Sequence, residues 1–356
     1  MQEIKIGKIA VGDKNPCFII AEAGSNWKVH KNPKDNLELA KQFIKTAKKF
    51  GADAVKFQLF RAIKMYSPES GECDYLKWKK PIYDIIKECE MPYEWIPELA
   101  DYCRKKDIVF LSSPFDEVSA DKLEDLVPAF KIASYLITHI PFLKFIAKKG
   151  KPLIVSTGAS TITDIDNALR AIYSQGNTNV ALMQCSAKYP ASFDNANLRV
   201  IKTLEKIFGV PVGFSDHTKD PIVCPVAAVA LGACIIEKHF TLDNKFEGPD
   251  QKFAIEPDKL KMMVHSIRST EKSLGSCKKD VTSEEKELHG FCRSRIYAIK
   301  DIARGEKITS DNVAILRSGK LEAGLEPVYW DVIVGKYVTK NIKKYEGILW
   351  SHLISE

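Results

Sequence analysis

The sequence predicts a (β/α)8 barrel followed by a small second domain. Eight short apolar runs rich in β-branched residues alternate with amphipathic helical segments, and the composition changes after residue 275. Strands that alternate with helices form a parallel sheet. Eight such units over roughly 260 residues match the usual size of a closed TIM barrel. A doubly wound open sheet is the alternative that this alternation leaves open.

The eight predicted strands share a high content of Val, Ile and Phe and a polar residue near the carboxyl end. Short apolar runs of this kind are typical of strands buried in a parallel sheet. They read, in chain order, FIIAEAG (18–24), AVKFQLF (54–60), VFLSSPF (109–115), AFKIAS (129–134), LIVSTGAS (153–160), VALMQC (180–185), VPVGFS (210–215) and CIIEKHF (234–240).

Helical patterns fill the intervals between the strands. Residues 35–51 place apolar side chains at helical spacing and end at a glycine, which often stops a helix. Residues 220–232 begin near a proline and end at a glycine, and the helix from Pro257 closes the barrel. The alternating residues 1–16 predict a short hairpin ahead of the first barrel strand.

The change in composition divides the chain. The barrel domain is expected to occupy residues 1–275. Residues 276–292 are charged and weakly apolar, which predicts a linker with one exposed helix. Residues 293–356 are expected to form the second domain, with short strands and a helix that begins at Ser310 or Asp311.

Composition argues against several classes of protein. No apolar stretch is long enough to span a bilayer, and the N-terminus lacks a signal-peptide core, so we expect a cytoplasmic protein without membrane contact. The net charge of +7 suits anionic substrates, but the lysines form dispersed pairs near helix ends and no nucleic-acid-binding stripe. The nine cysteines are scattered, which predicts reduced thiols. The lack of a GxGxxG motif or P-loop argues against nucleotide cofactors.

Polar and charged residues gather at the predicted carboxyl ends of the strands. A barrel builds its active site there, because the loops that follow the strands open on one face. Ammonium groups and hydroxyls together favour a small ligand that bears phosphate and carboxylate groups. The residues are Glu22, Lys56, Gln58, Ser112, Ser113, Lys131, Ser134, Ser156, Thr157, Gln184, Cys185, Ser186, Ser215, Asp216, His217, Glu237 and His239.

The lysines and glycines of this set also have a purely structural interpretation. A buried lysine without a partner is costly, so Lys56 and Lys131 can be paired with Glu22 or Glu237 for packing alone. The glycines of STGAS and GFSDHT are either turn residues or positions where backbone amides approach a phosphate.

His217 and His239 indicate a metal site. They follow the seventh and eighth strands, which are neighbours in a closed barrel, so both imidazoles can bind one ion that keeps open coordination positions. Two histidines are few for zinc, and we expect a harder divalent ion, Mn2+ first, with Mg2+ or Co2+ as alternatives. Asp216 and Glu237 are candidates for orienting the two rings.

The same residues lie in a series of motifs that closely resembles the sialic acid synthase family, whose members make N-acetylneuraminic, legionaminic and pseudaminic acids. The tail, with IYAIKDIARGEKITSDNVAILRSG and VGKYVTKNIKKYEGI, is similar to the family's C-terminal antifreeze-like (SAF) domain. The resemblance covers nearly the whole chain. The barrel motifs are FIIAEAGSN, GADAVKFQ, FLSSPFD, KIAS, STGAS, QCSAKYPA, NLRVI, GVPVGFSDHT, AAVALGACIIEKHFTLD and EGPD.

The resemblance implies a metal-dependent condensation of phosphoenolpyruvate with the open-chain aldehyde of an acylamino hexose, usually N-acetylmannosamine, to a nine-carbon 2-keto acid and phosphate. It implies that His217 and His239 bind the metal and that Glu22 moves a sugar hydroxyl proton, which makes these three the predicted catalytic residues. Residues implied to hold phosphoenolpyruvate are Lys56, Ser113, Lys131, Ser134, Ser156 and Ser215. Residues predicted to contact the sugar are Gln58, Tyr189, Glu237, Asp250 and Arg317.

The resemblance also implies a domain-swapped homodimer. In the family the SAF domain reaches over the barrel of the partner subunit and contributes an arginine to the acyl group of the sugar. Arg317 stands where that arginine is expected, with Ser318 in place of the usual proline. Taken alone, Arg317 has a plainer interpretation as a charge in a solvated loop.

Three departures from the family pattern bear on the sugar. The usual NH after the first strand is Asn26-Trp27, a common acid is Leu136, and the loop after the sixth strand carries Ala187 and Lys188. We therefore hypothesise that the phosphoenolpyruvate chemistry is kept while the sugar is not N-acetylmannosamine. A diacetamido-trideoxy hexose, as used for legionaminic or pseudaminic acid, is the alternative acceptor.

Other functions fit the sequence less well. A barrel that makes seven- or eight-carbon keto acids from phosphorylated aldoses would need a second phosphate site, and the strand ends show no spare arginine cluster. A pyruvate aldolase would not need so many phosphate-type donors. The antifreeze-like tail alone would suggest an ice-active or binding protein, but the complete set of catalytic-type residues at the strand ends argues against it.

Overall fold

The computed structural model describes residues 3–72 and 80–353. The chain divides into two compact units, Met1–Gly275 and Ser276–Glu356. In the described part of the chain, no helix combines the length and the apolar character needed to cross a membrane.

Eight parallel strands form the sheet of the first unit. The first of them pairs with the last, and the others follow in sequence order, with β5 and β6 packed side by side. This circular order confirms the predicted (β/α)8 barrel and excludes the open sheet. The strands are β3 (Phe18–Gly24), β4 (Ala54–Leu59), β5 (Val109–Pro114), β6 (Phe130–Ile132), β7 (Leu153–Ser156), β8 (Val180–Cys185), β9 (Val212–Asp216) and β10 (Ile235–His239).

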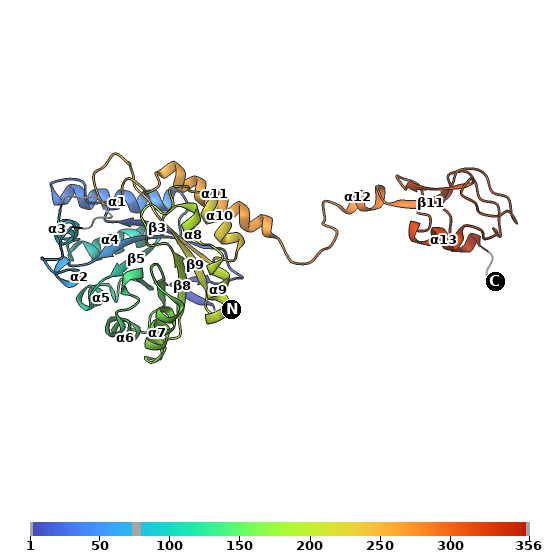
Figure 1. The fold of residues 1–356 in the computed structure, drawn as a ribbon. Helices are drawn as coiled ribbons and strands as arrows, with labels where there is room; N and C mark the ends of the chain where they lie inside the picture. Colours follow the sequence, from blue (N-terminus) through green and yellow to red (C-terminus); the bar gives the residue numbers. More distant parts are fainter. Residues whose placement is uncertain (1–2, 73–79, 354–356) are drawn as a thin grey trace. The chain divides into compact units, whose positions relative to one another are not determined.

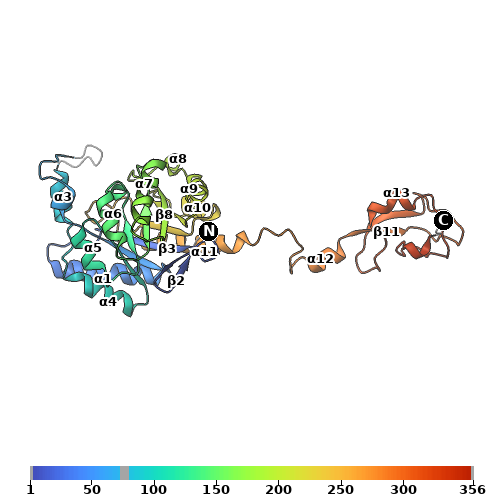
Figure 2. The same ribbon diagram turned by 90° about the horizontal axis from the view of Figure 1, so that it is seen from below.

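Helices connect the strands and cover the outside of the ring, as Figures 1 and 2 show. The predicted helices at 35–51, at 220–232 and from Pro257 correspond to α1, α10 and α11. The longer helices are α1 (Pro33–Lys49), α4 (Trp95–Lys105), α5 (Glu117–Leu123), α6 (Ile140–Ala147), α7 (Ile162–Tyr173), α9 (Val200–Phe208), α10 (Val223–Ala230) and α11 (Pro257–Leu274). Shorter ones are α2 (Ala62–Met65), α3 (Ile82–Glu88) and α8 (Phe193–Ala196).

Local sequence explains where the helices begin. The Asn32 side chain accepts a hydrogen bond from the Lys34 amide, and Pro33 occupies the first turn of α1. At the start of α7, Thr161 and Asp164 form a reciprocal capping box. These caps satisfy amide groups that a helix cannot bond within itself, so they fix the point at which each loop ends.

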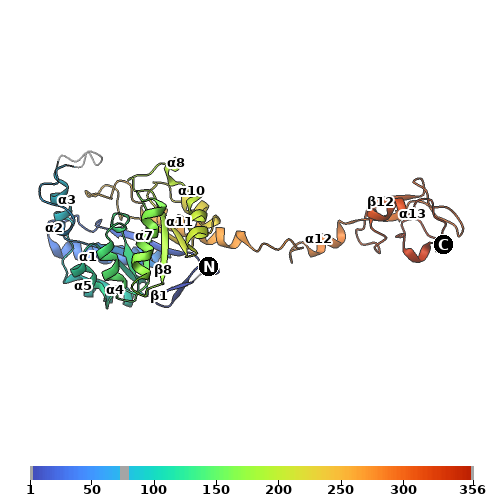
Figure 3. The same ribbon diagram turned by 60° about the horizontal axis from the view of Figure 1, so that its bottom comes forward.

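The barrel interior is apolar at its amino-terminal end. The predicted hairpin of β1 (Ile4–Ile6) and β2 (Ile9–Val11) packs its buried isoleucine and valine side chains against interior residues of the strands. It is drawn in blue in Figure 3. A second apolar layer lies between the strands and the helices. Polar side chains are therefore left to the opposite end, where the strands finish.

The second unit has a small apolar core of its own. Strand β11 (Ser294–Ala298) pairs antiparallel with β12 (Val313–Arg317). Helix α12 (Lys286–Phe291) is exposed along its length, as expected for a linker helix. Short helical turns follow at η3 (Pro327–Tyr329), α13 (Trp330–Ile333) and η4 (Trp350–His352).

The prediction of a helix that begins at Ser310 or Asp311 is wrong. Residues 310–312 form a turn, and the chain then enters β12. The Asn312 side chain accepts a hydrogen bond from the Thr309 amide, an arrangement that turns and helix starts share. The β-branched run that follows pairs with β11 and continues as a strand.

Candidate active site

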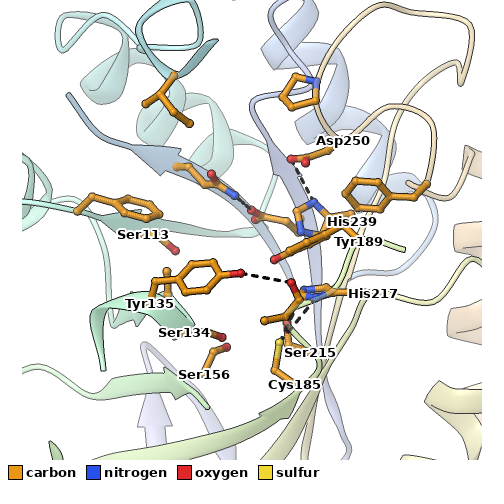
Figure 4. A pocket seen from close by; sticks show the side chains of 18 of the residues that line it. Ser113, Ser134, Tyr135, Ser156, Cys185, Tyr189, Ser215, His217, His239 and Asp250 are labelled. Carbon is orange, nitrogen blue, oxygen red and sulfur yellow. Dashed lines mark hydrogen bonds and ion pairs between the residues drawn. The ribbon is translucent and has the colours of Figure 1, made fainter. Parts of the chain in front are cut away.

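A pocket of about 800 Å³ opens at the carboxyl ends of the barrel strands. Figure 4 shows several of its side chains pointing into one shared space. Arg317 lies outside this pocket, exposed at the end of β12 in the second unit. Of the other polar residues predicted at the strand ends, Cys185 also lines the pocket, whereas five do not: Ser112, Thr157, Gln184, Ser186 and Asp216. The predicted residues that line the pocket are Glu22, Lys56, Gln58, Ser113, Lys131, Ser134, Ser156, Tyr189, Ser215, His217, Glu237, His239 and Asp250.

Lys56 lies between two carboxylates inside the barrel. Its Nζ is 2.7 Å from Glu22 Oε2 and 3.6 Å from Glu237 Oε1, and it donates to Ser113 Oγ at 3.2 Å. Strand register places Glu22 beside Lys56. Burial disfavours the ammonium, but the two carboxylates outweigh burial and raise the pKa of Lys56. Lys56 is therefore charged although it is buried.

Lys131 is compensated less well than Lys56. Its Nζ is 3.6 Å from Glu237 Oε1, the carboxylate oxygen that it shares with Lys56, and it donates to Ser156 Oγ at 2.6 Å. Burial lowers the pKa of Lys131, and the attraction of Glu237 offsets this only in part because Lys56 repels it. A buried ammonium in this state would gain from an anionic ligand.

Serine hydroxyls surround the two lysines, and the loop after β7 supplies a backbone amide. The Gly158 amide donates to Ser134 Oγ at 3.1 Å. A Cβ at Gly158 would lie 2.9 Å from Ser134 Oγ and 3.2 Å from Cys185 Sγ, so only glycine lets this loop approach so closely. The glycine of STGAS therefore brings the chain to the lining of the pocket.

His217 follows β9 and is held by a backbone carbonyl. Its Nδ1 is 2.6 Å from the carbonyl oxygen of Ser186. Because a carbonyl only accepts, Nδ1 carries the hydrogen and Nε2 keeps its lone pair. The Tyr189 ring stacks on the imidazole with centroids 4.0 Å apart. Burial, followed by the nearby His239, holds the pKa of His217 well below its usual value, so this ring is neutral.

His239 ends β10, in register with Glu22. Its Nδ1 is buried, has no hydrogen-bond partner among the described residues, and lies 3.5 Å from Asp250 Oδ2. Burial, followed by Lys56, lowers the pKa of His239 to about 3. Burial, followed by the charge of Glu22, raises the pKa of the partly accessible Asp250 to about 7. Both histidines therefore offer neutral rings at neutral pH.

Two neutral imidazoles suit a divalent metal. The ring centroids of His217 and His239 lie 5.5 Å apart. Imidazole nitrogens bind metals at about 2 Å, so both rings can reach one ion. Within residues 3–72 and 80–353, no three His, Cys, Asp or Glu side chains gather as a ligand set. The donors thus fit an ion whose other positions are filled by water and substrate.

The sequence matches the NeuB family over residues 43–279 and a SAF domain over residues 295–354. The chain belongs to the NeuB family.

Similar proteins match this NeuB-family chain over most of their length. The spore coat polysaccharide biosynthesis protein SpsE of Bacillus subtilis is 42% identical, over 99% of this chain and 98% of its own. The N,N'-diacetyllegionaminic acid synthase of Campylobacter jejuni is 38% identical, over 93% of this chain and 98% of its own. The solved N-acetylneuraminic acid synthetase of Leptospira borgpetersenii, in complex with citrate, has a TM-score of 0.72 and 32% identity, over 81% of this chain and 95% of that one.

The two acids considered as partners of the histidine rings bind lysines instead. Asp216 Oδ2 is 2.5 Å from Lys238 Nζ, on the outer face of the barrel. Glu237 pairs with the two pocket lysines. The groups that lie at the Nδ1 atoms are the Ser186 carbonyl and the Asp250 carboxylate. Neither Asp216 nor Glu237 therefore orients an imidazole by direct contact with the ring.

One of the residues that depart from the family pattern lines the pocket. Trp27 is 2% exposed and packs edge-on against Trp95, and Leu136 packs against the apolar core; neither is a lining residue. Ala187 lines the pocket. Tyr135, which the sequence analysis missed, also lines it and donates to the Ala187 carbonyl at 3.3 Å.

Other lining residues were also missed because they lie in loops and short helices, not at strand ends. Phe253 packs against His239 with centroids 5.3 Å apart. An apolar wall that includes Met65, Ile82 and Ile85 comes from α2 and α3. The motif EGPD precedes Phe253, but no motif marked Met65, Ile82 or Ile85.

The lowered pKa of His239 predicts how stability depends on pH. The unfolded chain takes up a proton below about pH 6.5, whereas the folded ring stays neutral down to about pH 3. Falling pH in this window therefore favours the unfolded state, by up to about 1.4 kcal/mol per pH unit. Urea unfolding of the metal-free protein should show wild type losing more stability than His239→Asn between about pH 7 and about pH 5.

The matched control for this experiment is His265→Asn, which removes an exposed histidine of α11. We expect it to follow the wild-type pH dependence. Parallel curves for wild type and His239→Asn would contradict a buried, neutral His239.

Proposed function

We propose that this NeuB-family protein is a nonulosonic acid synthase, which condenses phosphoenolpyruvate with the open-chain aldehyde of an acylamino hexose to give a nine-carbon 2-keto acid and phosphate. The observation that carries the proposal is Lys131, a buried ammonium with one shared carboxylate partner, in the same pocket as two neutral histidines. Relatives named as synthases of N,N'-diacetyllegionaminic acid, pseudaminic acid and N-acetylneuraminate 9-phosphate support it.

Phosphoenolpyruvate is proposed to bind over the two lysines. Lys131 and Lys56 supply charge to its phosphate and carboxylate groups. The hydroxyls of Ser113, Ser134, Ser156 and Ser215 supply directional donors around that charge. The ligand would provide the negative charge that Lys131 lacks in the free protein.

The bond changes follow from the two substrates. C3 of phosphoenolpyruvate attacks the aldehyde carbon, a C–C bond forms, and the aldehyde oxygen takes up a proton. C2 becomes electron-deficient, and a water adds to it with loss of a proton. The bond between C2 and the bridging oxygen then breaks, and inorganic phosphate leaves with that oxygen. The C2 hydroxyl loses its proton to give the keto group.

Glu22 is proposed to move a proton of a sugar hydroxyl. Its Oε1 accepts a hydrogen bond from Gln58 Nε2 at 2.7 Å, and its Oε2 faces Lys56. These partners fix the carboxylate at the base of the pocket. Gln58, Tyr189, Glu237 and Asp250 are proposed to surround the sugar.

His217 and His239 are proposed to hold the metal through their Nε2 atoms, with Mn2+ as the first choice and Mg2+ or Co2+ as alternatives. When bound, a divalent ion supplies a Lewis acid for the aldehyde oxygen. The Ser186 carbonyl fixes the tautomer of His217, and the Tyr189 ring restricts its rotation.

The acceptor is proposed to differ from N-acetylmannosamine. Ala187 and its contact with Tyr135 change one wall of the pocket. Similarity to the N,N'-diacetyllegionaminic acid synthases of Legionella pneumophila and Campylobacter jejuni, at 36% and 38% identity, supports a diacetamido-trideoxy hexose as the acceptor.

The protein is proposed to act in the cytoplasm as a domain-swapped homodimer. The described cysteines are all free, which suits a reducing compartment. Arg317, exposed in the second unit, is proposed to contact the acyl group of the sugar in the partner's barrel.

Phosphate release from phosphoenolpyruvate with Mn2+ tests the reaction across N-acetylmannosamine, its 6-phosphate and diacetamido-trideoxy hexoses. We expect fastest turnover with a diacetamido sugar and a product of nine-carbon acid mass. His217→Ala should fold and lose turnover. Equal or faster turnover of N-acetylmannosamine would refute the acceptor proposal, and failure to bind phosphoenolpyruvate would refute the reaction.

Mixed dimers test the role of Arg317. Arg317→Ala and His217→Ala should each be inactive alone, because each lacks one half of every active site. Co-expression of the two should restore turnover, since a swapped dimer with one subunit of each kind holds one complete site. No restoration, with mixed dimers present by mass spectrometry, would contradict an exchanged arginine.

A further inference from the structure

A buried ion pair lies directly behind the two histidines. Asp216 ends β9, and Lys238 stands opposite it on β10, with Nζ 2.5 Å from Asp216 Oδ2. Both residues are 1% exposed, and neither lines the pocket. Side chains alternate between the two faces of a strand, so the pair faces the helices while its chain neighbours His217 and His239 face the pocket.

The pair also bonds to the chain beyond His217. Lys238 Nζ donates to the Thr218 carbonyl at 2.6 Å, and Asp216 Oδ1 accepts from the Thr218 amide at 2.8 Å. The backbone pairing of β9 with β10 ends at Asp216. Side chains therefore continue the connection past the end of the strand, and His217 sits between two anchored residues.

This arrangement ties the backbone of His217 to the residue that precedes His239. The separation of the two imidazoles then depends on the pair as well as on the ring contacts. A buried ion pair is a weak source of stability, because apolar residues of similar volume often serve as well or better. Stability alone therefore does not explain why an ion pair lies in the apolar layer between strands and helices.

We propose that Asp216 and Lys238 are positioning residues that hold His217 and His239 at the separation needed to bind one divalent ion. The inference rests on the proposed metal-binding role of the two histidines. Neither residue touches the ion or a substrate; both act through the backbone of the loop at His217.

The double variant Asp216→Val/Lys238→Met tests the proposal, because it keeps the site buried and removes the polar contacts. We expect a free energy of unfolding at or above that of wild type. We expect Mn2+ affinity, measured by electron paramagnetic resonance of the free ion, to fall about 10- to 100-fold, as for other residues that orient metal ligands. The kcat of phosphate release should fall, with KM for phosphoenolpyruvate nearly unchanged.

Two further variants keep the test decisive. Arg268→Met removes an ion pair with Asp53, which lies just before β4 at the opposite end of the barrel, and should lower stability with Mn2+ affinity unchanged. Lys238→Arg keeps the charge but not the shape of the ammonium, and should lie between wild type and the double variant in Mn2+ affinity. If the double variant does not fold, the Mn2+ affinity of Lys238→Arg tests the proposal in its place.

Wild-type Mn2+ affinity in the folded double variant, or in Lys238→Arg if only that folds, would overturn the proposal. If wild type itself binds no Mn2+, the metal part of the proposed function fails, and nitrogen NMR of the metal-free protein decides instead. Wild type should then show His217 with hydrogen on Nδ1, and the variant should show averaging between tautomers. Unchanged imidazole spectra would overturn the proposal independently of the metal.

Discussion

The burial of charge at the mouth of the barrel governs the chemistry of the pocket. Lys56, Lys131, Glu22 and Glu237 are at most 4% exposed. An ion taken out of water costs several kcal/mol unless partners compensate it. Strand register provides that compensation fully for Lys56 and only in part for Lys131. In the free protein Lys131 therefore keeps a charge that an anionic ligand would compensate.

The same burial prepares the histidines. Desolvation is the largest cause of the lowered pKa in His217, His239 and Lys131 alike. Neutral imidazoles beside buried ammonium groups can bind a metal without first losing protons. The β1–β2 hairpin and the apolar layers fill the other end of the barrel with apolar side chains, so polar side chains are confined to one face. One physical cause thus underlies both the proposed anion site and the proposed metal site.

Much of this could be predicted from the sequence because barrel closure is a strong geometric rule. It makes the seventh and eighth strands neighbours, which brings His217 and His239 together. Sequence could not show that Asp216 faces outward, since a shift of one residue reverses the face of a strand side chain. Nor could it show that Trp27 packs in the core, because a position next to a motif does not fix the direction in which the side chain points. Tyr135 was missed because it lies in a 3-10 turn after β6, beyond the strand end.

The most direct test of the anion site is calorimetric binding of phosphoenolpyruvate, without sugar, to wild type and Lys131→Met, with exposed Lys105→Met as the charge-matched control. We expect at least a tenfold weaker Kd for Lys131→Met, since loss of a buried charged partner costs about 2–5 kcal/mol in binding. We also expect the free energy of unfolding of Lys131→Met to be no lower than that of wild type, because an undercompensated ammonium is removed. Unchanged affinity together with lost stability would show that Lys131 serves packing alone and would contradict an anion site at Lys131.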